Sequence, residues 1–183
     1  AIIGDEFTKA NIQILAKAMA MKMQSEGVAD TGIVMGYDRR FLSKETIFWS
    51  CEVFAKEGIK VWFVNRSVPT PLIMFYVMKH KFPYGMMVTA SHNPPEYNGY
   101  KVYDSKGCQF CTEDAKNAIG FINNITDYSA IPFTEGSDLI TYIGEKELSA
   151  FLAEVKKQSL YEEKSDLKIV YTPLHGTGNI PVR

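Results

Sequence analysis

Apolar residues follow two different spacings along this chain, and the two alternate. Helical spacing predicts helices that begin near residues 8, 43, 70, 112 and 145. Short continuous apolar runs predict buried strands at residues 32–36, 59–64, 86–89 and 167–171. Alternation of strands with helices is typical of a three-layer α/β fold.

Residues that favour helix starts stand at the predicted boundaries. Thr8, Ser43 and Thr112 are candidate N-caps, because a short side-chain oxygen can accept a hydrogen bond from the first turn. Thr70 is a further candidate cap, and it precedes a proline at the first helical position. Local capping chemistry therefore agrees with the helix starts inferred from periodicity.

A hairpin is predicted after the third strand. Residues 99–103 and 108–110 flank the turn-forming stretch 104–107. A hairpin adds an antiparallel strand, so we expect a mixed sheet within a three-layer α/β/α sandwich.

A polar, turn-rich stretch at 123–137 is interpreted as a connection between domains. The residues that follow supply one predicted helix and one predicted strand, too little for an independent core. We therefore predict one domain over 1–139 and the truncated beginning of a second α/β/α domain over 140–183.

Composition narrows the range of partners. Hydrophobic residues make up 46% and charged residues 22% of the 183 residues, which argues against disorder. The formal net charge is −1, so no bulk field draws nucleic acid or an anionic membrane. No apolar stretch approaches the roughly 20 residues that span a bilayer, and the first residues lack the pattern of a signal peptide. We expect a cytoplasmic protein without a nucleic-acid or membrane partner.

The chain has three cysteines, which fit a reducing compartment. Cys51 lies on an apolar helical face and is expected in the core. Cys108 and Cys111 have metal-ligand spacing, but a structural zinc site needs four ligands and no second pair exists. We interpret this pair as part of the hairpin, with a metal or redox role as the alternative.

The stretch 86–101 contains the strongest candidate site. Its apolar start leads into a loop that carries Ser91, His92 and Asn93, followed by two prolines that restrict the backbone. Open α/β sheets bind ligands at the carboxyl ends of their strands. A serine hydroxyl is a weak nucleophile unless activated, so the residues alone leave Ser91 as a functional group or as a turn-capping serine.

Loops after the other predicted strands carry Asp38, Arg39, Arg40, Arg66 and Thr70. If the strands are parallel neighbours, these loops meet the serine loop at one edge of the sheet. Arginine suits phosphate because its planar fork of donors binds two oxygens. The alternative is a solvated loop in which Asp38 pairs with an arginine at the surface.

Two stretches of the serine region resemble a known family. Residues 89–94, Thr-Ala-Ser-His-Asn-Pro, are similar to the active-site serine loop of the α-D-phosphohexomutases, the phosphoglucomutase and phosphomannomutase family. Residues 98–101, Asn-Gly-Tyr-Lys, are similar to the next motif of that family. The resemblance implies that Ser91 is carried as phosphoserine, gives its phosphoryl group to a sugar phosphate and takes another back.

A third stretch, Gly-Tyr-Asp-Arg-Arg at 36–40, is similar to the family's Gly-x-Asp-x-Arg motif. By position Arg40 matches the motif arginine, and Arg39 falls on the variable place. The resemblance implies that Arg40, His92 and Lys101 position and neutralise phosphate, with Lys101 an active-site residue. From the residues alone, Lys101 could equally be a strand lysine pointing to solvent, and His92 could simply make the loop rigid.

Further phosphate or substrate contacts are expected from Asn93 and from His175, although the Gly-Thr-Gly that follows His175 is weak evidence alone. The resemblance also implies a Mg²⁺ ion, with Ser91 as a ligand through its phosphate and the remaining ligands in a later domain. It implies a hexose 1,6-bisphosphate as intermediate and activator.

The same resemblance covers nearly all of this chain but about the first third of a full enzyme. Residues 174–178 are similar to the start of the second of four domains, and the family's short Gly-Arg-rich segment before the first helix is missing. We therefore expect a fragment that is inactive alone, because the loops that choose the sugar belong to later domains.

The leading hypothesis is an isomerase of the phosphohexomutase type that moves phosphate between positions 1 and 6 of a hexose. A phosphopentomutase or an amino-sugar phosphomutase of the same family is the first alternative. A serine hydrolase is the second; it lacks the Gly-x-Ser-x-Gly elbow, and a histidine adjacent to the serine in sequence would rarely be oriented toward it. A non-catalytic module that binds sugar phosphate is the third.

Overall fold

A computed structural model describes residues 1–128, 131, 133, 136–161 and 166–183. Its centre is a mixed sheet with strand order β4-β3-β1-β2-β5, in which β3 and β4 are antiparallel and the other neighbours are parallel. The strands are β1 (Ile33–Tyr37), β2 (Val61–Ser67), β3 (Tyr84–Val88), β4 (Tyr100–Tyr103) and β5 (Ile140–Ile143).

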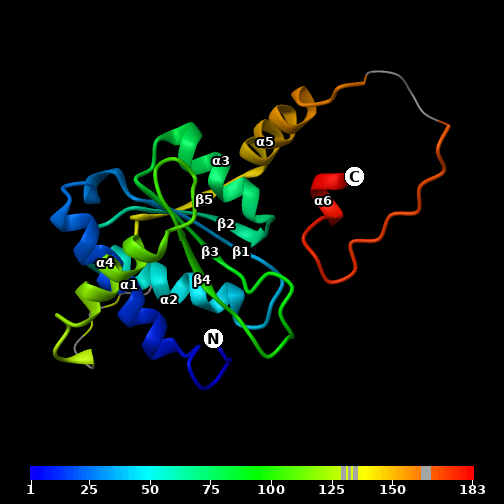
Figure 1. The fold of residues 1–183 in the computed structure, drawn as a ribbon. Helices are drawn as coiled ribbons and strands as arrows, with labels where there is room; N and C mark the ends of the chain where they lie inside the picture. Colours follow the sequence, from blue (N-terminus) through cyan, green and yellow to red (C-terminus); the bar gives the residue numbers. More distant parts are fainter. Residues whose placement is uncertain (129–130, 132, 134–135, 162–165) are drawn as a thin grey trace.

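Helices cover both faces of this sheet, as Figure 1 shows. On one face lie α1 (Lys9–Ser25), α2 (Ser43–Lys56) and α4 (Thr112–Ile122). On the other lie α3 (Thr70–His80) and α5 (Glu145–Lys157). A 3₁₀ turn at Ala29–Thr31 precedes β1, and the short helix α6 (Asn179–Val182) ends the chain. The predicted three-layer α/β/α sandwich with a mixed sheet is confirmed.

The central strand β1 shows why its sequence makes a buried strand. Ile33 and Met35 pack in the core beneath α1 and α2, whereas Val34 packs in the core beneath α3. A continuous apolar run is needed because successive side chains point to opposite faces and both faces are covered. Gly36 lets α3 pack close to β1, since a Cβ there would lie 2.5 Å from Ile73 Cδ1.

The predicted helix starts are correct to within a residue, but most of the predicted caps are wrong. Thr8 does cap α1, and its Oγ1 accepts from the Asn11 amide at 3.3 Å. The N-caps of the next helices are Leu42, Pro69 and Cys111, each one residue before the predicted Ser43, Thr70 and Thr112. Ser43 is not a cap because its hydroxyl hydrogen-bonds to side chains of neighbouring loops.

The sheet extends beyond the predicted domain boundary at 139/140. Strand β5 pairs in parallel with β2, and α5 packs against α3, so residues 140–157 complete the first sheet and one of its layers. Residues 129–130, 132 and 134–135 of the predicted connection lie outside the described residues. That the later residues open a second domain stays a prediction.

The predicted strand at 167–171 is wrong. These residues have no assigned secondary structure, and their apolar side chains are largely exposed, Val170 to 98%. A strand needs a neighbour to pair with, and no strand in the described part of the chain forms a ladder with this segment. Among the described helices, none is long and apolar enough to cross a membrane.

Candidate active site

Loops that follow β1, β2 and β3 meet at one edge of the sheet, where the parallel strands end. The connection from β1 leads to α2 on one face and that from β2 to α3 on the other, which opens a crevice between neighbouring strands. A cavity of about 540 Å³ lies there. Its lining comprises Asp38, Arg39, Arg40, Val68, Thr70, Met87, Thr89, Ser91, His92, His175, Gly176 and Thr177.

Ser91 lies at the surface of this cavity. It directly follows the buried run Gly85–Ala90, and its own side chain is exposed. Its φ of 57° is in the left-handed region, a conformation that costs a non-glycine residue about 1–3 kcal/mol. The backbone N–H of Ser91 donates to Thr89 Oγ1 at 2.9 Å, so the bend at the end of β3 is stabilised locally.

Arg40 binds the backbone of the serine loop. Its Nη1 and Nη2 donate at 2.5–2.9 Å to four carbonyl oxygens, those of Ser91, Asn93, Pro94 and Tyr97. Its Nε lies 3.7 Å from Asp38 Oδ2, and its side chain is only 13% exposed. Arg40 is therefore close to Ser91, as predicted, but it contacts the main chain of the loop.

A second set of hydrogen bonds joins the loop after β1 to the turn before β4. Asp38 Oδ1 accepts from the Ser43 hydroxyl at 3.0 Å, and the Asn98 amide donates to Ser43 Oγ at 2.9 Å. Asn98 is fully buried, and its Oδ1 accepts from the amide of Gly99 at 2.8 Å. Gly99 has no room for a side chain, because a Cβ would lie 2.6 Å from the Thr89 carbonyl oxygen.

His92 is oriented toward the serine. Its Nδ1 lies 3.2 Å from Ser91 Oγ, within hydrogen-bonding reach. The expectation that adjacent residues would not meet in this way is wrong, because the left-handed conformation of Ser91 bends the chain between them. An imidazole in this position can accept the proton of the serine hydroxyl.

Of the other predicted site residues, His175 lines the Ser91 cavity, whereas Asn93 and Lys101 do not. His175 lines the cavity together with Ser91, although the two lie far apart in sequence. Asn93 is exposed, and its carbonyl oxygen accepts from Arg40. Lys101 lies opposite Met87, a lining residue of the cavity, but Lys101 itself lines a separate groove beside α1 and α4.

Of the arginines near the strand ends, Arg39 and Arg66 differ from Arg40. Arg66 lies in β2 and pairs with Glu145 through both terminal nitrogens, at 2.6 and 3.1 Å. Arg39 is exposed and lines the cavity, and within the described residues its guanidinium has no hydrogen bond or ion pair. Strand-end position alone grouped Arg39 with the other arginines, but the family motif gave it no role, because the motif leaves its position variable.

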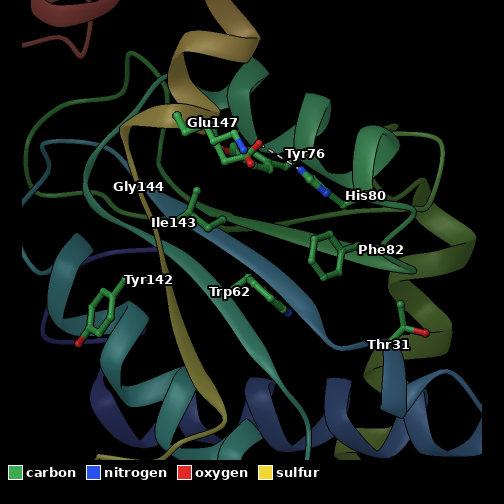
Figure 2. Close-up of a pocket in the computed structure, with 10 residues that line it drawn as sticks. Thr31, Trp62, Tyr76, His80, Phe82, Tyr142, Ile143, Gly144 and Glu147 are labelled. Atoms are coloured by element: carbon green, nitrogen blue, oxygen red, sulfur yellow. Dashed lines mark hydrogen bonds and ion pairs between the residues drawn. The ribbon is translucent and has the colours of Figure 1, made fainter.

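A second cavity, of about 480 Å³, lies between α3, α5 and the sheet (Figure 2). Trp62, Tyr76, His80 and Phe82 line it with aromatic rings, and Glu147 lies 3.3 Å from His80 Nε2. None of the predicted site residues lies in this cavity.

The described residues do not form a metal site on their own, since no three His, Cys, Asp or Glu side chains among them group closely enough. Cys111 donates its thiol hydrogen to Asp114, which lowers the pKa of that carboxyl group together with the Cys111 amide. Cys51 is buried in the core, as expected, and burial raises the pKa of its thiol.

Residues 1–129 match the family model described as phosphoglucomutase/phosphomannomutase, alpha/beta/alpha domain I. The chain belongs to the phosphoglucomutase/phosphomannomutase family. The serine loop, the Asp38–Arg40 loop and the Asn98–Lys101 turn all lie within the matched residues.

Relatives agree with this membership. The phosphoglucomutase of Staphylococcus haemolyticus is 33% identical over 175 residues, which are 93% of this chain and 32% of that protein. The phosphoglucomutase of Staphylococcus aureus is 33% identical over 177 residues, with 95% and 32% covered. A crystal structure assigned as a phosphomannomutase from Thermus thermophilus matches with a TM-score of 0.72 and 31% identity, over 86% of this chain and 33% of that one. The chain thus spans about a third of the length of these family members.

Proposed function

We propose that this chain is the serine-bearing part of a phosphohexomutase, in which Ser91 carries the phosphoryl group. The observation that supports this most directly is the position of Ser91. Its exposed hydroxyl lies in a cavity at the carboxyl ends of the strands, with His92 Nδ1 at 3.2 Å. Membership of the phosphoglucomutase/phosphomannomutase family supports the reaction class that we propose, interconversion of hexose 1-phosphate and hexose 6-phosphate.

The reaction proceeds by two phosphoryl transfers. The phosphorus–oxygen bond of phosphorylated Ser91 breaks as a bond forms to a free hydroxyl oxygen of the hexose phosphate, giving a hexose 1,6-bisphosphate. The hexose hydroxyl releases its proton, and the departing Ser91 oxygen takes up a proton. The bond between the sugar oxygen and the other phosphoryl group of the bisphosphate then breaks as a bond forms to Ser91 Oγ, and the sugar oxygen takes up a proton. In the return step His92 Nδ1 takes the hydroxyl proton of Ser91, which leaves an oxygen nucleophile.

The cavity offers positive charge for the transferred group. Arg39 contributes this charge as a guanidinium, and His92 and His175 also line the cavity, whereas the one carboxylate of the lining, Asp38, lies beside Arg40. Phosphoserine carries about −1.5 to −2 charges at neutral pH, so it requires such partners. Members of this family typically depend on Mg²⁺. Because the described residues do not form a metal site on their own, we assign no step to the ion.

The test is the phosphorylation state of Ser91 in the full-length protein. We expect peptide mass spectrometry to find one added phosphoryl group on Ser91 after incubation with glucose 1,6-bisphosphate. The variant Ser91→Ala should lose both the modification and mutase activity. Ser105→Ala is the matched control, because Ser105 is exposed in the turn after β4 and does not line the cavity. Normal turnover by Ser91→Ala would disprove the proposal.

The contact between His92 and Ser91 also bears on a serine hydrolase, the second candidate. A hydrolase base is itself oriented by a third group, and no hydrogen bond to His92 Nε2 exists within the described residues. Labelling of Ser91 by an organophosphate ester, with no phosphoryl transfer from the bisphosphate, would favour the hydrolase.

A further inference from the structure

The two adjacent arginines of the loop after β1 have different surroundings. The side chain of Arg40 is 13% exposed, and its two terminal nitrogens donate to four carbonyl oxygens of the serine loop. Those nitrogens carry four N–H bonds in total, so this set of acceptors occupies all of them. The remaining N–H is on Nε, and this nitrogen lies 3.7 Å from Asp38 Oδ2.

Arg39 has the opposite situation. Its side chain is exposed, and it lines both the Ser91 cavity and the adjoining hollow that contains Lys44 and Glu45. Within the part of the chain that the structure describes, its guanidinium donates to no acceptor. Arg39 is therefore the lining arginine whose donors are available to an anion.

We propose that the two arginines divide the work of the site: Arg39 binds phosphoryl oxygens in the Ser91 cavity, and Arg40 is a positioning residue that holds Ser91 through its backbone. This rests on the phosphoryl-carrier function proposed above for Ser91. It reverses the expectation from the sequence motif, in which Arg40 binds phosphate and Arg39 falls on a variable place.

The contacts of Arg40 explain how Ser91 keeps its conformation. Ser91 has a φ of 57°, which an L-residue adopts only when its surroundings require it. Arg40 binds the carbonyl of Ser91 itself and those of residues 93, 94 and 97, so one planar group fixes the loop on both sides of the prolines. A lysine could not replace it, because a single ammonium carries three donors and no fork.

The Arg39 half is tested by the second ionisation of phosphoserine, followed by ³¹P NMR in the full-length protein phosphorylated with glucose 1,6-bisphosphate. A neighbouring cation favours the dianion and lowers this pKa. Arg39→Gln should raise it by on the order of half a unit, since the site is exposed, and Arg39→Lys should raise it less. An unchanged pKa in Arg39→Gln would overturn the assignment of Arg39.

The Arg40 half is tested by hydrogen exchange, which does not depend on phosphorylation. In Arg40→Lys we expect the amides of residues 89–99 to exchange at least about 10-fold faster, because the loop carbonyls lose the guanidinium donors that hold the loop in place. The amides of β1 and β2 serve as an internal reference for global unfolding. Arg39→Gln should leave exchange in the loop within about twofold of the parent. Parent-like protection of the loop in Arg40→Lys would overturn the positioning role.

Failure of the proposed function gives a different result. If the parent protein shows no phosphoserine signal at all, the carrier function is wrong, and the Arg39 half is wrong with it. If phosphoserine forms and its pKa responds to Arg40→Lys but not to Arg39→Gln, the carrier function stands and the division between the arginines is reversed.

Discussion

The chain contains two cavities of similar size that are built in opposite ways. The Ser91 cavity is formed by loops at the strand ends, and charged side chains fix those loops by hydrogen bonds to the backbone. The aromatic cavity of Figure 2 is formed by rings on α3, β2 and β5 and by Phe82, beside a hydrogen bond between His80 and Glu147.

The volumes of the Ser91 cavity and the aromatic cavity, about 540 and 480 Å³, do not distinguish the two, but their construction does. Binding and catalysis require polar groups at fixed positions, and the Ser91 loop has them at the cost of a strained residue. The aromatic cavity lies against rings that stabilise the fold, among them Tyr76, which is only 2% exposed. Substitutions in the two places should therefore act on different properties.

The largest effect on stability is expected in the wall of the aromatic cavity. Tyr76→Ala should lower the free energy of unfolding by about 3–5 kcal/mol, because it removes a buried ring and leaves a void. Urea denaturation measures this loss. Tyr76→Phe is the control: the Tyr76 hydroxyl is buried without a partner among the described residues, so its removal should be neutral or stabilising by up to about 1 kcal/mol. A loss below about 1 kcal/mol in Tyr76→Ala would refute the claim that this wall is structural.

The next effect concerns the Ser91 loop. Arg40→Gln should lower the free energy of unfolding by about 2–4 kcal/mol, because several charge-assisted hydrogen bonds vanish and Asp38 loses its cation. Arg66→Gln is the matched control. Arg66 also pairs through two nitrogens, but its partner Glu145 is 74% exposed, so we expect a loss of about 0–1 kcal/mol. Equal losses in the two variants, from urea midpoints at constant slope, would contradict the comparison.

A smaller effect is expected at the end of the serine loop. Gly99→Ala should lower the free energy of unfolding by about 1–3 kcal/mol, because its Cβ would lie 2.6 Å from the Thr89 carbonyl oxygen. Gly120→Ala in α4 should have the opposite sign, a gain of about 0.5–1 kcal/mol, since nothing lies within 4 Å and alanine favours helices. Thermal melts of the two variants provide the test, and a stabilised Gly99→Ala would be incompatible with this geometry.

The smallest effect is a pH dependence in the aromatic cavity. Burial, and then Lys79, lower the pKa of His80 in the folded protein. The unfolded chain therefore binds this proton first, and stability falls as the pH drops through the ordinary range of histidine, about 6.5, toward the lower folded value. His80→Gln should reduce that loss slightly, because the side chain is 39% exposed and Glu147 lies nearby. Urea midpoints between about pH 7.5 and 5.5 measure this loss of stability in the parent and in the variant. A steeper loss in His80→Gln than in the parent would contradict the prediction.

The layers of the fold could be predicted from the sequence because they depend on local patterns. The apolar run around Val34 and the helical spacing from Ile12 to Met23 each specify an element that is buried on the expected side. Strand β5 was missed because its four residues follow a polar stretch and pair with β2, some 80 positions earlier. Pairing between strands so far apart in sequence produces no local periodicity from which the strand could be predicted.

The position of the candidate site in the fold could be predicted from the sequence, but the contacts of its side chains could not. Motifs and strand ends placed Ser91, His92 and the arginines together, and the structure has them in one cavity, apart from Arg66. The cap predicted at Ser43 failed because its hydroxyl bonds to Asp38 and Asn98, which lie in two different loops. The orientation of His92 depends on the positive φ of Ser91, which the residue types in this loop do not predict.

Strand β5 determines where this protein can be shortened. The amide of Val61 donates to the Leu139 carbonyl, and the pairing continues through Ile143. A version ending at residue 139, the boundary that the sequence suggested, would leave most of β2 with an open row of backbone donors and acceptors. Such a bare strand invites pairing between molecules and precipitation during expression. A stop after Lys157, the last residue of α5, keeps that edge covered.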